Sequence, residues 1–224
     1  MSVLWHLEEL QSPVAARKSS VGAGPRPLDP LPVVRMLCSS GGQYIEPHGT
    51  ANFSLRALFC VVDLFRLPDE PVDPRPGFTY YFHEGGFDRS DFPVFVLLRS
   101  EHPPRDIGEH RVGNHLLLGT STETHLLYGN SVAQAYEHPE TKDILFPFPN
   151  MGVLQTGRYL MRYQVCDRRQ SPIVARCYGT PFTVFDATQF PGLEPSTPFT
   201  ESLAPLNVPG LRIRRQAPVA GGLV

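Results

Sequence analysis

The sequence predicts an all-β protein: one antiparallel β-sandwich with immunoglobulin-like layering, long loops and one or two short helices. Proline and glycine are plentiful, with 24 and 19 residues among 224. Apolar and polar residues alternate in many short runs, and few segments show helical periodicity. Short alternating runs separated by turn residues are typical of β-sandwiches and barrels. The number of runs and the spacing of the turns favour the immunoglobulin-like arrangement.

The clearest strand covers residues 157–165. Every second residue there is apolar: Tyr159, Met161, Tyr163 and Val165. The residues between them are mostly polar, and this period of two predicts a half-buried strand. Two further strands are expected at residues 173–177 and 181–185, separated by Gly179.

The last part of the chain predicts a short helix at residues 196–206 and a basic strand at residues 211–215, Leu-Arg-Ile-Arg-Arg. Residues 217–224 are mostly small, and we expect this tail to be disordered.

Upstream, residues 2–10 suggest one or two helical turns capped by Ser2, too short to be stable alone. Residues 11–24 have the composition of a loop. Prolines force an extended path on residues 25–32, because proline fixes its own φ and disfavours helix in the residue before it. Recognition of this stretch by a polyproline-binding partner is an alternative. Residues 33–37 then predict a strand.

The middle of the chain predicts further strands. Residues 57–62 are apolar on both faces and indicate a fully buried strand within a longer β-rich stretch, residues 51–65. Residues 92–98 predict another strand. Shorter strands are expected at residues 78–82, 116–118, 124–128 and 129–136.

Several functional classes find no support in the sequence. No apolar run approaches the roughly 20 residues of a membrane span, so we expect no membrane partner. The first ten residues lack a basic region and are not typical of a secretory signal. Nucleophile elbows, Walker loops and dinucleotide fingerprints are missing, so we expect no enzyme, no catalytic residue, no cofactor and no small-molecule substrate.

Metal binding is also not expected. The four cysteines form no Cys-x-x-Cys pair and are expected to be small buried residues of a reduced, intracellular protein. A polar cluster at residues 83–88 has no matching second pair of ligands. Three histidines in residues 101–115 fit a surface loop, with a pH sensor as the alternative.

Charge is unevenly distributed along the chain. Residues 69–143 carry thirteen acids against six Lys/Arg, whereas residues 12–35 carry four basic residues against one acid. From residue 144 to the end, eight arginines face four acids. Two basic ends around an acidic middle are consistent with a polyanion-binding face assembled by the fold. They are also consistent with arginines that solvate outward strand positions.

Four segments, in this order, resemble the velvet domain of fungal developmental regulators. They are Phe-Pro…Gly-Arg-Tyr-x-x-Arg-Tyr (146–163), Pro-Phe-Thr-Val-Phe (181–185), Phe-Pro-Gly (190–192) with Ser-Thr (196–197), and Arg-Ile-Arg (212–214). The Pro-rich stretch adds Arg26-Pro27-Leu28-Asp29-Pro30, which is similar to the family's Arg-Pro-Ile-Asp-Pro. The resemblance covers residues 11–216 and is closest to the velvet C subgroup.

The resemblance implies a Rel-homology-like sandwich. It places a velvet domain at residues 11–216, between an N-terminal extension at residues 1–10 and the tail at residues 217–224. It implies a DNA-binding transcriptional regulator of fungal development, sporulation and secondary metabolism. Such a regulator would act as a homodimer or as a heterodimer with another velvet-family protein, in the nucleus or shuttling with the cytoplasm.

The resemblance also implies where DNA is contacted. The family's DNA contacts are attributed to the basic segment before the Pro-rich stretch, which corresponds here to Arg17, Lys18 and Arg26, with Arg35 just beyond. Arg168 and Arg169, in a predicted hairpin loop, are further candidates because loops at the end of such sandwiches bind DNA. Five other C-terminal arginines are expected on strand surfaces or at a dimer rim: Arg158, Arg162, Arg212, Arg214 and Arg215.

The chain departs from the family in the segment before Arg26. Many members carry a dense Lys-Asp-Arg-Arg run there, whereas this chain has Gly22-Ala23-Gly24-Pro25-Arg26. An alternative function follows from this departure. The chain would be a non-catalytic interaction subunit that modulates a DNA-binding velvet partner and has little DNA affinity of its own.

Overall fold

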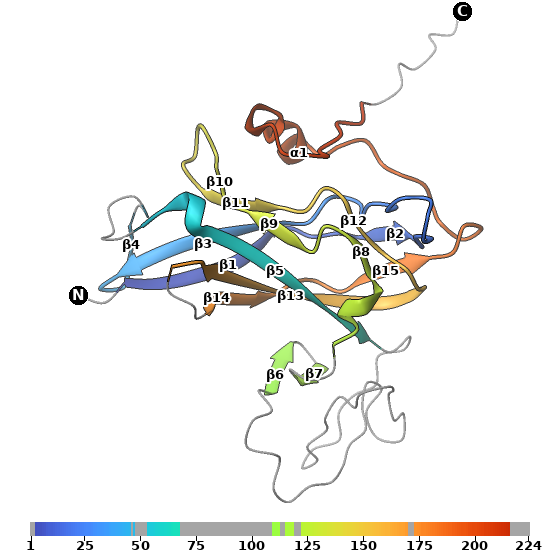
Figure 1. Ribbon diagram of the computed structural model, residues 1–224, viewed down its shortest axis with the longest axis horizontal. Helices are drawn as coiled ribbons and strands as arrows, with labels where there is room; N and C mark the ends of the chain where they lie inside the picture. Colours follow the sequence, from blue (N-terminus) through green and yellow to red (C-terminus); the bar gives the residue numbers. More distant parts are fainter. Residues whose placement is uncertain are drawn as a thin grey trace, which may run out of the picture.

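The computed structural model describes residues 3–45, 47, 53–67, 109–112, 115–118, 122–169 and 173–215. Two sheets face each other in these residues, so the predicted all-β sandwich is confirmed (Figure 1). The strands are β1 Val3–Gln11, β2 Ala15–Arg17, β3 Val33–Ser40, β4 Gln43–Ile45, β5 Leu58–Leu67, β6 Glu109–Val112, β7 His115–Leu118, β8 Leu127–Gly129, β9 Val132–Gln134, β10 Tyr136–Glu137, β11 Ile144–Pro147, β12 Met151–Val153, β13 Gly157–Asp167, β14 Ile173–Tyr178 and β15 Phe182–Phe185. The helix α1 covers Pro198–Ser202, and three 3-10 turns cover Leu55–Ala57, Thr124–Leu126 and Ala204–Leu206.

The strand order separates the two sheets. One sheet runs β1-β3-β11-β10, with β4 added to β3, and the other runs β2-β15-β13-β5-β9, with β14 added to β13. Pairing within these sheets is antiparallel except between β15 and β2, which are parallel. Two small ribbons, β8-β12 and β6-β7, complete the described strands.

The N-terminal segment is a strand, and the expected helical turns at residues 2–10 were wrong. β1 pairs with β3 from Val3 to Gln11, with one irregularity after Glu9. Long-range pairing outweighs local helix propensity in so short a segment. The Glu9 carboxylate accepts hydrogen bonds from the Tyr163 hydroxyl (2.7 Å) and the Thr180 N–H (2.6 Å), which ties β1 to the opposite sheet.

β13 is the central strand of its sheet and confirms the strand predicted at residues 157–165. The predicted inward residues Tyr159, Met161, Tyr163 and Val165 are fully buried in the core between the sheets. The opposite face of β13 is also buried, contrary to the half-buried expectation. Arg162 is only 8% exposed there, because Asp63 on β5 neutralises it and the Phe65 ring packs under its guanidinium.

The predicted helix at residues 196–206 corresponds to α1 and the 3-10 turn that follows it. Thr197 caps α1 by accepting a hydrogen bond from the Thr200 N–H (3.0 Å). A second apolar cluster joins this region to the outer face of β3 and β11, through Leu31, Val33, Leu145, Leu203 and Leu211. The chain is thereby held beside the first sheet up to its C-terminal segment.

The basic strand expected at residues 211–215 is not formed. Its backbone hydrogen bonds join Arg214 to Ser196 and the Leu211 N–H to the Val208 carbonyl, and none of them pairs the segment with a strand of either sheet. The loop expected at residues 11–24 contains β2, which pairs with β15 as a parallel strand. The strands expected at residues 78–82 and 92–98 lie outside the described residues.

The other short strands were predicted with mixed success. Residues 33–37 and 173–177 lie in β3 and β14, residues 182–185 of the strand expected at 181–185 form β15, and residues 116–118 lie in β7. Part of residues 124–128 forms a 3-10 turn before β8. The strand expected at residues 129–136 is divided into β9 and β10.

Candidate nucleic-acid interface

The loop between β2 and β3 forms the first wall of the candidate site. The Ser19 N–H donates to the Val153 carbonyl (2.8 Å), and the buried Ser19 hydroxyl accepts from the Arg26 N–H (2.8 Å). The Leu28 N–H then donates to the Met151 carbonyl (2.9 Å). Because both ends of the loop are fastened to β12, the chain brings Arg26 back to β2.

Gly152 in β12 makes this close fastening possible. A Cβ atom at this position would lie 2.4 Å from the Ser19 hydroxyl oxygen and 2.6 Å from the Arg26 carbonyl oxygen. Both distances are far below van der Waals contact. The absence of a side chain at residue 152 therefore allows the loop to lie directly on β12.

The C-terminal segment, residues 208–215, forms the second wall. Arg214 forms an ion pair with the buried Asp29, and its Nε donates to the Glu194 carbonyl (2.8 Å). Its backbone N–H donates to the Ser196 hydroxyl (2.9 Å), while its carbonyl accepts from the Ser196 N–H (2.8 Å). The second oxygen of Asp29 accepts from the Glu194 N–H (2.9 Å). These contacts fix the segment beside the Pro-rich stretch.

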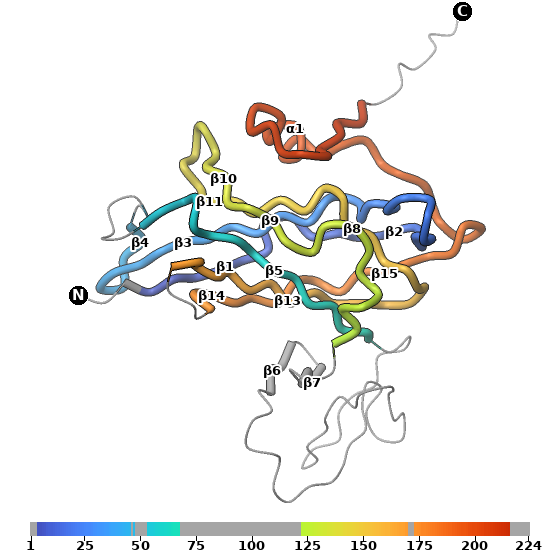
Figure 2. Tube along the Cα trace, viewed as in Figure 1, coloured from blue at the N-terminus to red at the C-terminus, as the bar shows by residue number. Residues whose placement is uncertain are grey.

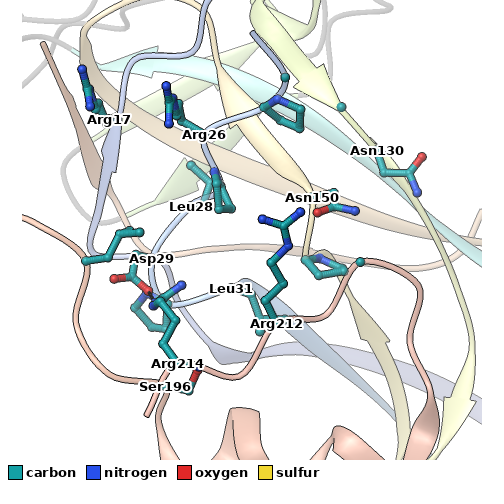
Figure 3. Close-up of a pocket in the computed structure, with 18 of the residues that line it drawn as sticks. Arg17, Arg26, Leu28, Asp29, Leu31, Asn130, Asn150, Ser196, Arg212 and Arg214 are labelled. Atoms are coloured by element: carbon teal, nitrogen blue, oxygen red, sulfur yellow. Dashed lines mark hydrogen bonds and ion pairs between the residues drawn. The ribbon is translucent and has the colours of Figure 1, made fainter. Parts of the chain in front are cut away.

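A cleft of about 850 Å³ lies between the two walls (Figure 3). Four arginines line it: Arg17 and Arg26 from the first wall, and Arg212 and Arg214 from the second. Its lining acid, Asp29, is paired with Arg214. Within the described ranges, no acidic side chain forms an ion pair with any of the other three arginines. The cleft therefore carries uncompensated positive charge, which attracts polyanions. We call this set of four residues the arginine cleft.

Three of the residues predicted from the sequence to contact DNA lie on the first wall of the cleft. Arg17 ends β2, Lys18 follows it as an exposed side chain, and Arg26 is exposed on the returning loop. Hydrogen bonds from Thr188 and the N–H of Gln189, together with the charge of Lys18, lower the pKa of Asp186. The positive charge of Lys18 is therefore partly offset by Asp186. The charges of Arg17 and Arg26 are offset less.

Arg35 lies elsewhere. It is in the middle of β3, where its Nε donates to Glu8 on β1 (2.7 Å) and its Nη1 lies 3.4 Å from Asp143. Partial burial opposes protonation, but the hydrogen bond to Glu8 and the charge of Asp143 outweigh it and raise the pKa of Arg35. Its charge is committed to joining strands of the first sheet.

Arg168 and Arg169 lie in the turn after β13, which confirms the expected hairpin position. Arg169 bonds to Asp167 through Nε (3.0 Å) and Nη2 (2.7 Å), and Arg168 lies over the Phe59 ring. This turn is at the end of the sandwich near β4, whereas β2 is at the opposite end (Figure 1). The structure therefore does not bring this pair to the arginine cleft.

Arg212 and Arg214 line the cleft although the sequence patterns assigned them to a strand surface. The signal that pointed to them was the uneven charge distribution, with one basic region at residues 12–35 and another after residue 144. The chain after β15 runs around the end of the sandwich that holds β2 and continues to α1, so the two basic regions meet (Figure 2). Local alternation could not reveal this meeting.

Other types of site are not formed by the described residues. No group of three or more His, Cys, Asp or Glu is placed to hold a metal there, and the cluster at residues 83–88 lies outside the described ranges.

All four cysteines are free. Burial raises the pKa of every one of them, to about 12 for Cys177, so the thiols stay protonated and weakly nucleophilic. No helix among the described residues is long and apolar enough to cross a membrane.

Comparison with known proteins gives this architecture a family. The family model for velvet factors matches residues 97–217, more than half of the chain. The chain belongs to the velvet family. The match includes β11 to β15 and both the helix and the C-terminal wall of the cleft, so the resemblance inferred from the sequence motifs is confirmed.

Two curated velvet proteins resemble the chain over most of its length, and a third resembles it over about a third. A probable velvet family sexual development regulator from Laccaria bicolor is 28% identical over 232 residues, which cover 88% of this chain and 66% of the relative. One from Schizophyllum commune is 29% identical over 220 residues, covering 90% and 69%. A third, from Coprinopsis cinerea, is 40% identical over 86 residues, covering 34% and 52%. The velvet chain described here thus spans about two thirds of the length of the first two, and it is a member of a family of developmental regulators.

Proposed function

We propose that this velvet-family chain is a DNA-binding transcriptional regulator of fungal development that contacts DNA phosphates with the arginine cleft. The observation that carries the proposal is the meeting of Arg17, Arg26 and Arg212 without acidic partners. Arginines that are not needed for ion pairs within the fold are available to phosphate oxygens. The names of the curated relatives support a role in development.

The finer features of the proposal follow the family resemblance. The regulator would act in sporulation and secondary metabolism, as a homodimer or as a heterodimer with another velvet protein, and in the nucleus. Phosphate contacts would supply affinity and register on the duplex, and other side chains would recognise base edges. No catalytic step is part of this function.

A triple variant tests the proposal. Arg17→Ala, Lys18→Ala and Arg26→Ala together should lower the slope of log affinity against log salt by roughly 2 to 3, since each phosphate contact contributes about 0.9. Thermal stability should hardly change, because these side chains lie on the surface and contribute little to the core. Binding of the purified chain to random-sequence duplex DNA at two or more salt concentrations measures the slope.

The matched control changes cations at the other end of the sandwich. Arg168→Ala with Arg169→Ala should leave the salt slope nearly unchanged, because neither residue lines the cleft. A triple variant that binds like the wild type would refute the assignment of the cleft. If the double variant loses more DNA affinity than the triple variant, the DNA contact is at the β13–β14 turn.

A second candidate function is the interaction subunit that modulates a DNA-binding velvet partner. It is favoured by the loop at residues 22–26, where Arg26 is the one cation, and by the neutralisation of Arg214 by Asp29. The same experiment separates the two functions. Sequence selection by the chain alone supports the DNA-binding regulator, whereas selection only after mixing with another velvet protein supports the modulating subunit.

A further inference from the structure

Two adjacent serines in the first wall of the cleft have opposite surroundings. Ser19 is 1% exposed, and its hydroxyl accepts the hydrogen bond from Arg26 that closes the loop. Ser20 is exposed, and its carbonyl accepts a bond from the Ala23 N–H (3.2 Å), which turns the chain. The Ser20 hydroxyl has no hydrogen-bond partner in the described part of the chain. Of the pair, Ser20 is the hydroxyl that a modifying enzyme can reach.

Two cationic residues precede Ser20: Arg17, which is partly exposed at the end of β2, and Lys18, which is exposed. Arg17 and Lys18 stand three and two positions ahead of it, and neither forms an ion pair with a described acid. Gly22 and Gly24 follow with positive φ, and no atom lies within 4 Å of where their Cβ atoms would be. An exposed serine preceded by cations at these positions is complementary to a protein kinase whose peptide groove is acidic.

We propose that Ser20 is a phosphorylation site for a protein kinase that recognises basic residues ahead of its target, and that phosphate there switches off polyanion binding by the arginine cleft. The first part stands on the loop itself, and the second part rests on the proposed function. In the transfer, the Ser20 Oγ bonds to the γ-phosphorus of ATP and the bond from that phosphorus to the bridging oxygen breaks. ADP leaves, and the hydroxyl proton passes to the kinase.

The electrostatic consequence follows from the position of Ser20. A phosphoserine carries about −1.5 to −2 charges near pH 7 and three strong acceptor oxygens. The loop that carries Ser20 also carries Lys18 and Arg26, and it begins directly after Arg17. The phosphate would take charge-assisted hydrogen bonds from these cations and leave fewer of them for DNA. We expect the salt slope to fall by roughly 2 and the affinity for DNA to fall at least about tenfold.

The site is tested first without DNA. The full chain is incubated with MgATP and a basophilic kinase, such as the catalytic subunit of cyclic-AMP-dependent protein kinase, and the phosphate is located by mass spectrometry. A synthetic peptide of residues 14–23 is the positive control for the kinase. Phosphate on Ser20 and none on Ser19 is expected. A chain that stays unmodified at Ser20 while the peptide is phosphorylated, or that carries phosphate on Ser19 instead, overturns the proposal.

The switch is tested next with duplex DNA. Unmodified chain, phosphorylated chain, Ser20→Asp and Ser20→Asn are compared at two salt concentrations. Asparagine matches aspartate in size without its charge, so Ser20→Asn should bind within about twofold of the wild type while the phosphorylated chain loses affinity. Equal binding by the unmodified and phosphorylated chains overturns the switch. If the unmodified chain binds no duplex at all, the proposed function fails before any kinase is added, and the mapping alone still decides whether Ser20 is the site.

Discussion

Arginines occur in two contrasting settings in this molecule. On the outer faces of the sheets, Arg162 is nearly buried and bonds to Asp63 through Nε (2.9 Å) and Nη2 (2.6 Å), and Arg35 joins Glu8 and Asp143. In the arginine cleft, Arg17, Arg26 and Arg212 line a concave surface without an acidic partner among the described residues. The residue type is the same, but its charge is neutralised in one setting and available in the other.

This difference separates stability from binding. Removing an arginine that is paired and desolvated within a sheet destabilises the fold, because it leaves a carboxylate without its partner. An exposed, unpaired arginine contributes little to folding and increases the local positive potential. Substitutions of the paired arginines should therefore change the free energy of unfolding, and substitutions of the cleft arginines should change DNA affinity. A variant that changes both would contradict this distinction.

The largest effect on stability is expected from Arg162→Ala. The change leaves Asp63 partly buried without its cation, and the Phe65 ring loses the guanidinium that covers it. We expect the free energy of unfolding to fall by about 3 kcal/mol, the low end for a broken buried pair, because the Asp63 side chain keeps 23% exposure. Urea denaturation followed by fluorescence measures this loss.

DNA binding is the control for Arg162→Ala. The affinity per folded molecule and its salt slope should remain those of the wild type. Adding Asp63→Asn to the variant should restore part of the stability, since the unpaired charge is then removed. A reduced salt slope in Arg162→Ala would show that a paired arginine also contacts DNA, and the comparison would fail.

The fold was more predictable than the site, for a physical reason. Strand alternation is local, so Tyr159 and Met161 could be placed in the core from the sequence alone. Pairing with a distant partner is not local, so β1 was mistaken for helical turns and β2 for loop. The extended segment around Arg214 was mistaken for a strand, because its partners are a side chain and a loop rather than a sheet edge.

The part of the candidate site that lies in or just before the Pro-rich motif was predictable from the sequence. Arg17, Lys18 and Arg26 became candidates because they precede or belong to a recognisable Pro-rich stretch, and Arg17 and Arg26 line the cleft. Arg212 was assigned to a strand surface because its position in the cleft depends on the path of the chain around the end of the sandwich, which no local pattern encodes. Arg35 was included for its closeness in sequence, but its ion pairs with Glu8 and Asp143 commit it to the first sheet.

The next largest effect on stability is expected from Gly152→Ala, which lies under the first wall of the cleft. The new Cβ would overlap the Ser19 hydroxyl and the Arg26 carbonyl, so the loop must shift away from β12. We expect a loss of about 1 to 3 kcal/mol in the free energy of unfolding, the usual range for overpacking. Because Arg26 moves with the loop, DNA affinity should fall as well.

Gly152→Ala is compared with Gly41→Ala, at a turn where no atom would meet the new Cβ. Gly41, unlike Gly152, has a positive φ, so the control substitution is somewhat strained, but it lies between β3 and β4, away from the cleft. It should leave DNA affinity unchanged. Equal affinities for the Gly152→Ala variant and the wild type would show that the position of Arg26 does not matter for binding.

A smaller and more selective effect is expected from Arg212→Ala. This residue and Arg215 are both exposed in the same segment, but only Arg212 lines the cleft. Removing Arg212 should reduce the salt slope by about 0.9 and the affinity at 0.1 M salt by roughly five- to tenfold. Arg215→Ala should change the slope less, and thermal stability should stay the same in both. If Arg215→Ala causes the larger loss, the DNA runs along the C-terminal segment and not through the cleft.

The smallest effect is expected from Arg169→Ala, at an ion pair outside the cleft that joins this exposed arginine to Asp167. The side-chain hydrogen bond from Arg169 lowers the pKa of Asp167 in the folded chain, even though burial acts in the opposite direction. A carboxyl group with a lowered folded pKa stabilises the fold above its unfolded pKa, near 4, and loses this contribution as the pH falls through the folded value. Arg169→Ala should therefore unfold slightly more easily than the wild type at pH 7, and the difference should vanish on acidification toward pH 2. Thermal melts across that pH range test the sign, and a difference that grows toward acid would mean that Asp167 is not stabilised by Arg169.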